Sequence, residues 1–436
     1  MKPYQDYKKQ YRKFLILFLG FLIIFPFVFS SAKTVNELND KINQKNTDIG
    51  KLEEEIKQYQ LELNDLSKQK NSLNVSIKQL DLTKKKLNAD ISVTQNKIDK
   101  TNLKIQELSL NINDKQNIIY NNIDVISSDL RIINQFEQND ALLVMLSENN
   151  FTNVWNDIDN IVAVNDAIIK STTELKQVKI VLEDTRTETT KAKDELLSLK
   201  SKLSDQKKIV DENTREKNKL LIKTKNNETN YQKLLKDGLA KKDAFEKELR
   251  DYESQLQYVL DPSKLPNGGV LSWPLDYVLI TQSFGKTEAG KRLYASGTHN
   301  GVDFRAPIGT PVKALADGVV AGVGDTDIQC SGVSFGRFVL IKYNNGLAST
   351  FGHLSLIKVN TGDKVSRGEI VGYSGNTGYS TGPHLHLSIY AKDAVNLKTL
   401  PSKSCPGRVL TQPISPINAY LDPLYYLPST TASMFK

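Results

Sequence analysis

From residue 51 to residue 237 the chain contains neither glycine nor proline. These are the two residues that most often interrupt a helix, because proline lacks the backbone donor and glycine loses the most backbone freedom when it folds. From residue 262 onward both are frequent. This change of composition predicts a long helical region followed by a turn-rich globular domain. A length of 436 residues also favours more than one domain.

The helical region has a heptad repeat. Every seventh residue from Val35 to Ile119 is apolar except Lys70 and Lys84, and leucines such as Leu38 recur at the complementary positions. Sustained spacing of this kind predicts a coiled coil. One continuous helix over this stretch would be on the order of 130 Å long.

A second, weaker helical stretch runs from about 160 to 257, and a denser apolar segment lies between the two. Since the two stretches are similar in length, we expect residues 33–257 to form an antiparallel coiled-coil hairpin with a small helical tip near 137–158. A parallel dimer is the alternative. The apolar tip is either a docking surface for a partner or the small core of the tip itself.

The N-terminus predicts export. Basic residues, among them Lys8, Arg12 and Lys13, precede an apolar run from Phe14 to Phe29, and small residues follow. This is the layout of a secretory signal peptide over residues 1–32, with an uncleaved membrane anchor as the alternative. In either case the rest of the chain is expected to be extracytoplasmic, secreted or associated with the cell envelope.

The formal net charge of +8 has two interpretations. It either attracts the chain to an anionic surface or reflects a lysine-rich, solvated coiled coil. No cluster of basic and aromatic residues indicates nucleic-acid binding. Cys330 and Cys405, the two cysteines of the chain, are expected to form a disulfide in an oxidising compartment, with two buried thiols as the alternative.

All four histidines lie between residues 299 and 386. Imidazole is the commonest metal ligand and a common general acid or base. His299, Asp303 and His386 can supply three ligands to one Zn²⁺ ion. The fourth position would then be open to water, which is the arrangement of a catalytic zinc site.

Local patterns suggest where these side chains point. If His384-Leu385-His386 is a strand, both imidazoles project from one face. Asn344-Asn345-Gly346 is a hairpin turn signal, and pairing of the strands around it would place His353 just beyond a strand end. Glycines around His299 and Asp303 argue for a loop and a strand there, not a helix.

The motifs resemble a known family. Thr298-His299-Asn300-Gly301-Val302-Asp303 and Gly382-Pro383-His384-Leu385-His386 are similar to those of the lysostaphin/LytM-type zinc metallopeptidases. The resemblance covers about residues 270–395. It implies an antiparallel β fold, one zinc ion held by His299, Asp303 and His386, and a catalytic pair formed by His353 and His384. It also implies hydrolysis of peptide bonds in bacterial peptidoglycan. Ser388 stands where the family commonly has glutamate.

A second resemblance concerns the tip. Leu142–Ser147 and Phe151–Trp155 are similar to the tip of coiled-coil regulators of cell-wall hydrolases, the murein hydrolase activators. It implies a membrane-bound regulatory complex as a partner of the tip, beside the stem peptide or cross-bridge of peptidoglycan as substrate.

Together these observations predict a multidomain α + β protein. A coiled-coil hairpin (33–257) and a linker (258–269) precede an antiparallel β-sheet zinc peptidase domain (270–395) and a Pro/Tyr-rich extension (396–436). The expected function is an exported zinc endopeptidase that acts in cell-wall remodelling or division and is positioned or restrained by its hairpin. A non-catalytic activator of another hydrolase and a structural envelope spacer are the alternatives.

Overall fold

The computed structural model describes residues 35–66, 69, 72–138, 151–286, 298–380, 382–402 and 405–435. The predicted signal segment, residues 1–32, lies outside these ranges, and so does most of the predicted tip. None of the described helices combines the length and the apolar character needed to cross a membrane.

Four long helices form the N-terminal part. They are α2 (Val35–Leu66), α3 (Leu73–Gln138), α5 (Phe151–Thr224) and α6 (Glu228–Ser254). The expectation of one continuous helix from 35 to 119 is therefore wrong. Helix α2 ends at Leu66, Gln69 and Ser72 are not helical, and α3 begins at Leu73.

The start of α3 has its own caps. The Ser72 hydroxyl accepts a hydrogen bond from the Val75 amide, and the Glu228 carboxylate accepts one from the Leu73 amide. Free amides at a helix start need such acceptors. A heptad count does not register caps, and for that reason it missed this boundary.

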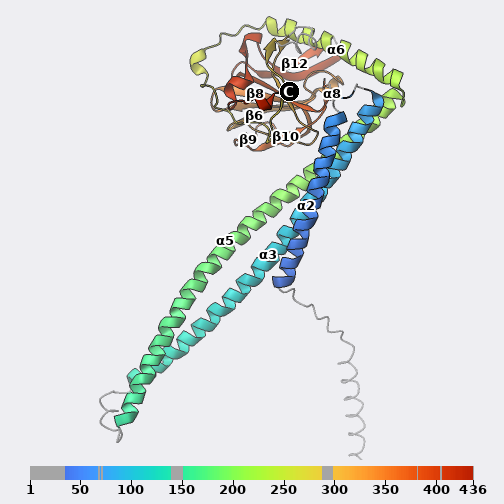
Figure 1. Cartoon of the computed structure of the whole chain (residues 1–436). Helices are drawn as coiled ribbons and strands as arrows, with labels where there is room; N and C mark the ends of the chain where they lie inside the picture. Colours follow the sequence, from blue (N-terminus) through green and yellow to red (C-terminus); the bar gives the residue numbers. More distant parts are fainter. Residues whose placement is uncertain are drawn as a thin grey trace, which may run out of the picture. The chain divides into compact units, whose positions relative to one another are not determined.

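Helices α3 and α5 are antiparallel. The chain divides into two compact units, one containing residues 102–192 and the other residues 45–101 and 193–436. In the first, Lys104 pairs with Glu188 at 3.6 Å. In the second, the Asn213 amide donates to the Leu80 carbonyl at 2.9 Å, and the Ser76 and Tyr231 hydroxyls lie 2.6 Å apart. Residue numbers rise on one helix as they fall on the other, as a hairpin requires (Figure 1).

The second unit contains an antiparallel β domain. Its main sheet has the order β1-β4-β11-β8-β7-β6-β9; β10 pairs with β5 and β8, and β14 pairs with β11. The strands of this sheet are β1 (Ile280–Gln282), β4 (Val302–Arg305), β5 (Pro311–Lys313), β6 (Gly318–Asp325), β7 (Arg337–Tyr343), β8 (Leu347–Ile357), β9 (Lys364–Val365), β10 (Ile370–Ser374), β11 (His384–Ala391) and β14 (Tyr420–Leu421). Two small sheets pair β2 (Gly285–Lys286) with β3 (Thr298–His299) and β12 (Asn396–Ser402) with β13 (Arg408–Ile414). Short helical segments are η1 (Pro262–Lys264), α8 (Thr326–Gln329), η2 (Ile417–Ala419), α9 (Pro423–Tyr426) and η3 (Ala432–Met434).

The core explains why polar side chains of β4 and β11 face the other way. Val302, Phe304, Leu385 and Leu387 are fully buried in the main apolar cluster. Successive side chains of a strand point to opposite faces. Asp303 and the two histidines of β11 are therefore directed away from this cluster.

The C-terminal segment is part of the domain. Strand β14 pairs with β11, so residues near 420 extend the same sheet that carries His384 and His386. Cys330 and Cys405 form a disulfide, which joins the segment after α8 to the turn between β12 and β13. The structure thus contains the bonded form of the two cysteines.

Helices α5 and α6 both contact the β domain within the second unit (Figure 1). Ile209 of α5 and Leu87 of α3 pack with Ile308 and Tyr373 of the domain. Phe245 of α6 packs in a separate cluster with residues that include Cys330, Val333 and Leu410. The β domain is thus in contact with the helical region on two patches.

Candidate metal centre

Strand pairing brings the predicted ligands together. Strand β11 pairs antiparallel with β4, which sets His386 opposite Asp303. His299 ends the two-residue strand β3, and a short turn connects it to β4. Gly301 lies in that turn, where a Cβ would lie 2.4 Å from the Leu387 carbonyl oxygen and 2.7 Å from the His386 ring. Only glycine fits this approach.

The three side chains fit a zinc ion. His299 Nε2 lies 3.2 Å from His386 Nδ1 and 3.4 Å from Asp303 Oδ1, and His386 Nδ1 lies 2.8 Å from Asp303 Oδ1. Ligand atoms about 2.0–2.1 Å from a tetrahedral zinc ion lie about 3.3–3.4 Å apart, so the spacing suits one ion. Two nitrogens and one carboxylate oxygen are also donors that Zn²⁺ prefers. The site therefore matches the predicted ligand set.

The remaining ring nitrogens of both histidines have partners. His299 Nδ1 lies 3.1 Å from the Ser283 carbonyl oxygen, and His386 Nε2 lies 2.9 Å from the Ser388 hydroxyl. Such partners fix the orientation and the tautomer of a metal-binding histidine. Sequence reasoning treated Ser388 only as a departure that bears on substrate, and it missed Ser283. The spacing of two residues from His386, on the same face of β11, was the available signal for Ser388.

His353 is not beyond a strand end, as the sequence suggested, but inside β8. The register of β7 against β8 shifts here, because Arg337 is opposite Leu354 while Val339 is opposite Phe351. His353 has φ +60°, which is unusual for a residue with a side chain. The irregular strand turns its imidazole toward the site, with ring centroids 4.6 Å from His384 and 5.9 Å from His386.

Both non-ligand histidines have their Nδ1 atoms held by carbonyl oxygens. His353 Nδ1 lies 2.8 Å from the Thr377 carbonyl oxygen, and His384 Nδ1 lies 2.8 Å from the Gly382 carbonyl oxygen. A carbonyl only accepts, so each Nδ1 donates a proton and each neutral ring keeps Nε2 as an acceptor. His384 Nε2 lies 3.7 Å from Asp303 Oδ1, next to the ligand group.

Asp303 and His386 favour the protonation states that a metal requires. Burial raises the pKa of Asp303, but the imidazoles of His299 and His384 outweigh it and hold this pKa well below its usual value. Burial lowers the pKa of His353 well below its usual value and also lowers the pKa of His386. An ionised carboxylate and neutral imidazoles are the forms that bind zinc.

Residues 297–397 match Peptidase family M23. The chain carries an M23 peptidase domain. The domain contains a His-Asp-His group able to hold a metal ion, and this donor set suits the zinc ion of a metallopeptidase.

Named relatives share this part of the chain. A protein of Buchnera aphidicola called "Uncharacterized metalloprotease" is 39% identical over 127 residues, which are 29% of this chain and 32% of the relative. "DD-carboxypeptidase/endopeptidase Mpg" of Neisseria gonorrhoeae is 34% identical over 154 residues, or 35% and 30% of the two chains. "Peptidoglycan DD-endopeptidase ShyA" of Vibrio cholerae is 45% identical over 94 residues, or 22% and 20%. The chain thus spans about a third or less of the length of these relatives.

Among solved structures, the chain is similar to the catalytic domain of lysostaphin from Staphylococcus simulans. The identity is 36%, the match covers 26% of this chain and 81% of that one, and the TM-score is 0.23. A score this low carries no argument about the fold, which rests on the strand pairing described above.

Proposed function

We propose that this chain is an exported zinc endopeptidase that hydrolyses peptide cross-links of bacterial peptidoglycan. The observation that carries the proposal is the convergence of His299, Asp303 and His386 on one point beside His353 and His384. The relative named "Peptidoglycan DD-endopeptidase ShyA" supports the substrate class. The scissile bond lies in a stem peptide or cross-bridge.

In the proposed mechanism, His299, Asp303 and His386 hold one Zn²⁺ ion. Bound zinc polarises a carbonyl and makes water nucleophilic near neutral pH. His353 and His384 are the proposed catalytic pair. Because each donates Nδ1–H to a backbone carbonyl, each presents Nε2 as a proton acceptor, which suits a general base. Burial lowers the pKa of His353 and so keeps its Nε2 unprotonated.

The test is release of soluble peptides from purified peptidoglycan by the full-length protein, with and without a zinc chelator, and with the new termini identified by mass spectrometry. Chelator-sensitive release of a new amine supports the endopeptidase and names the bond. A folded, zinc-loaded protein that releases nothing from several wall types would instead favour the non-catalytic activator.

We also propose that the helical arm restrains the site through α6. Glu246, Leu249, Arg250 and Glu253 of α6 line a cavity of about 160 Å³ together with the zinc-ligand candidate His299 and its neighbours. The Glu253 carboxylate accepts hydrogen bonds from the Tyr420 hydroxyl at 2.8 Å and the Ser415 amide at 3.4 Å. Helix α6 thus lies next to the zinc-ligand candidate His299, and in this proposal it limits access to the site from that side.

Export and a regulatory partner complete the proposal. The basic and apolar residues within 1–32 support a cleaved signal or an anchor, and the mass of the mature protein decides between them. A membrane-bound complex at division is the proposed partner of the coiled-coil tip near 137–158 and of the arm that leads to it. Exposed apolar side chains there, including Ile123, Leu130 and Ile169, support such a contact. Crosslinking of the exported protein in cells, with Leu130→Glu as the variant, tests this part.

The domain boundaries given above at 257 and 269 are part of the same proposal, as is a C-terminal extension after 395 whose strand β14 joins the main sheet. Limited proteolysis of the full-length protein checks them, because cleavage concentrates in exposed connections between domains.

A further inference from the structure

Arg337 lies opposite the irregular part of β8 that contains His353. It is the first residue of β7, and its register partner is Leu354, the residue after His353. The amide of His353 donates to the Phe335 carbonyl oxygen at 2.7 Å. Segment 335–337 is therefore the immediate support of the left-handed backbone at His353.

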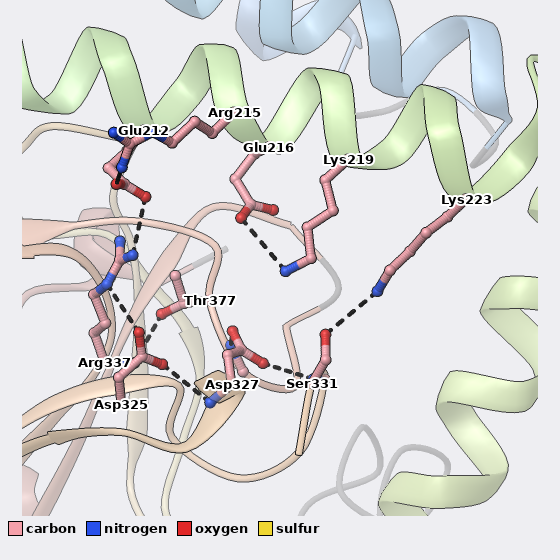
Figure 2. Close-up of polar contacts among 12 residues, drawn as sticks. Glu212, Arg215, Glu216, Lys219, Lys223, Asp325, Asp327, Ser331, Arg337 and Thr377 are labelled. Carbon is pink, nitrogen blue, oxygen red and sulfur yellow. Dashed lines mark hydrogen bonds and ion pairs between the residues drawn. The ribbon is translucent and has the colours of Figure 1, made fainter. Parts of the chain in front are cut away.

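The guanidinium of Arg337 uses all three nitrogens. Nε donates to Asp325 Oδ2 at 3.1 Å, Nη1 donates to the Ser355 carbonyl oxygen at 2.7 Å, and Nη2 donates to Glu212 Oε2 at 2.9 Å. Figure 2 shows Glu212 reaching down from α5 to the arginine while Asp325 contacts it from the domain. A planar group with donors in fixed directions holds three acceptors in one geometry. The second Glu212 oxygen is held by Arg215 at 2.8 Å.

A short path of hydrogen bonds joins Arg337 to the His353 ring. The Arg337 amide donates to Thr377 Oγ1 at 3.0 Å, and that hydroxyl donates to the Leu354 carbonyl oxygen at 2.9 Å. The Thr377 carbonyl oxygen is the group that accepts the His353 Nδ1 proton. A residue with positive φ persists only where its surroundings fix it firmly. Arg337 contacts the surroundings of His353 at two points, through its amide at Thr377 and through its guanidinium at the Ser355 carbonyl oxygen.

We propose that Arg337 is a positioning residue for His353 and that the carboxylate of Glu212 in α5 holds the Arg337 guanidinium in place for this role. In this arrangement the helical arm does more than restrain the domain. One carboxylate of α5 keeps the arginine in place, the arginine fixes Thr377 and the strand after His353, and Thr377 fixes the imidazole tautomer. The inference rests on the proposed function in one respect, namely that His353 takes part in catalysis.

The chain offers a matched control on the same helix. Asp205 of α5 also forms an ion pair with the domain, to Lys358 at 2.9 Å, and it accepts from the Tyr373 hydroxyl at 3.1 Å. None of these residues contacts Thr377 or His353 by a described hydrogen bond. Asp205→Asn and Glu212→Gln therefore make the same chemical change at two α5 contacts. Only the Glu212 contact leads through Arg337 to Thr377 and the His353 ring, whereas the Asp205 contact reaches Ser355 through the Tyr373 carbonyl oxygen.

The test is performed on the full-length protein labelled with ¹⁵N-histidine, because four histidines give a spectrum that single His→Ala variants assign. Ring nitrogen shifts report the tautomer of His353 in zinc-free and zinc-loaded protein without any assay of activity. We expect Glu212→Gln and Arg337→Lys to shift His353 away from the fixed Nδ1–H tautomer, whereas Asp205→Asn leaves it as in the wild type. On a soluble cross-linked muropeptide, kcat should fall roughly threefold for Glu212→Gln and about tenfold for Arg337→Lys, with KM unchanged.

Two results would overturn the inference. One is a wild-type His353 spectrum in folded Glu212→Gln and Arg337→Lys proteins. The other is an equal change in Asp205→Asn, which would mean that general loosening of α5 is the cause. Should the wild type cleave no muropeptide at all, the proposed function fails, but the ring nitrogen shifts still decide whether Arg337 positions His353.

Discussion

Helices α5 and α6 contact the same β domain with different chemistry. In addition to the apolar contact of Ile209, helix α5 uses ion pairs of defined geometry, Glu212 with Arg337 and Asp205 with Lys358, beside the strand that carries His353. Helix α6 uses the apolar side chain of Phe245 and the buried carboxyl of Glu253, beside the loop that carries His299. Ion pairs determine how the helix is positioned on the domain more than they stabilise the contact. Apolar burial stabilises the contact but does not depend strongly on the direction of the side chains.

Because of this difference, the proposed support of His353 by α5 and the proposed restraint by α6 cannot be measured separately by deleting the whole helical arm. Removing residues 33–257 would take away Glu212 together with α6. If α5 supports His353 and α6 covers the His299 side, the two effects oppose each other and the net change in hydrolysis is uninformative. Point variants on each helix are therefore the sharper experiments.

The largest effect should come from the centre on which both helices are proposed to act. Asp303→Ala removes one ligand, so zinc content should fall and hydrolysis should decrease about 1000-fold or more. His384→Ala should keep its zinc while losing about 100-fold in rate. Metal analysis and peptide release measure the two. Full zinc binding by Asp303→Ala would contradict the ligand assignment.

Next in size is the attachment of α5. Ile209 is 1% exposed in the cluster with Leu87, Ile308 and Tyr373. Ile209→Ala should destabilise this contact by about 2–4 kcal/mol, because it leaves a cavity in a packed site. Thermal unfolding and hydrogen exchange of α5 would measure the loss. Ile222→Ala is the control on the same helix, since Ile222 is 76% exposed and should change little.

The contact of α6 should depend on pH. Burial raises the pKa of Glu253 from 4.5 to about 7, against the opposing effects of its hydrogen bonds to Tyr420 and Ser415 and of nearby Arg250. With the folded pKa above the unfolded one, the folded state binds more protons, so stability is greatest below the unfolded value and falls as pH rises to about 7. The loss should be at most about 3 kcal/mol.

Hydrogen exchange of α6 at about pH 5 and about pH 8, corrected for intrinsic rates, measures this dependence. Glu253→Gln keeps an acceptor for Tyr420 and Ser415 but cannot ionise, so its profile should be flat. An unchanged pH dependence in that variant would assign the effect to another group.

The smallest expected effect tests whether α6 restrains the site. Leu249 of α6 lines the cavity next to His299 and packs against the cluster of Phe245. Leu249→Glu should loosen α6 and raise hydrolysis roughly tenfold, since a charge at this half-buried, apolar contact disfavours the docked helix. Leu239→Glu is the matched control, because Leu239 is 45% exposed on the same helix. If Leu249→Glu is no faster than this control, α6 does not restrain the site.

Much of the site could be predicted because its signals are local. The alternation in Val302-Asp303-Phe304 and Leu385-His386-Leu387 gives both the buried face and the ligand face of two strands. The motifs around these residues are enough to indicate the peptidase family. The irregularity at His353 was not predictable in the same way, because it depends on the register of β7 against β8.

The helical arm shows the same division. The absence of glycine and proline from 51 to 237 correctly predicted long helices, and the similar lengths of the two helical stretches correctly predicted antiparallel packing. The interruption between Leu66 and Leu73 was missed, since it is stabilised by Glu228, a residue far along the chain. A heptad pattern describes the spacing of nearby residues and therefore cannot predict a contact with a distant residue.

The sequence by itself therefore determined the helices, the strands and the His-Asp-His donor set, because residue spacing and side-chain chemistry are local properties. Only the tertiary structure decided that Ser388 orients His386, that Glu212 reaches Arg337 and that α6 lies beside His299. Those contacts join residues up to 125 positions apart in the Glu212–Arg337 pair. Their formation depends on how the helices dock and how the strands pair, which the free energy of the whole packed unit selects.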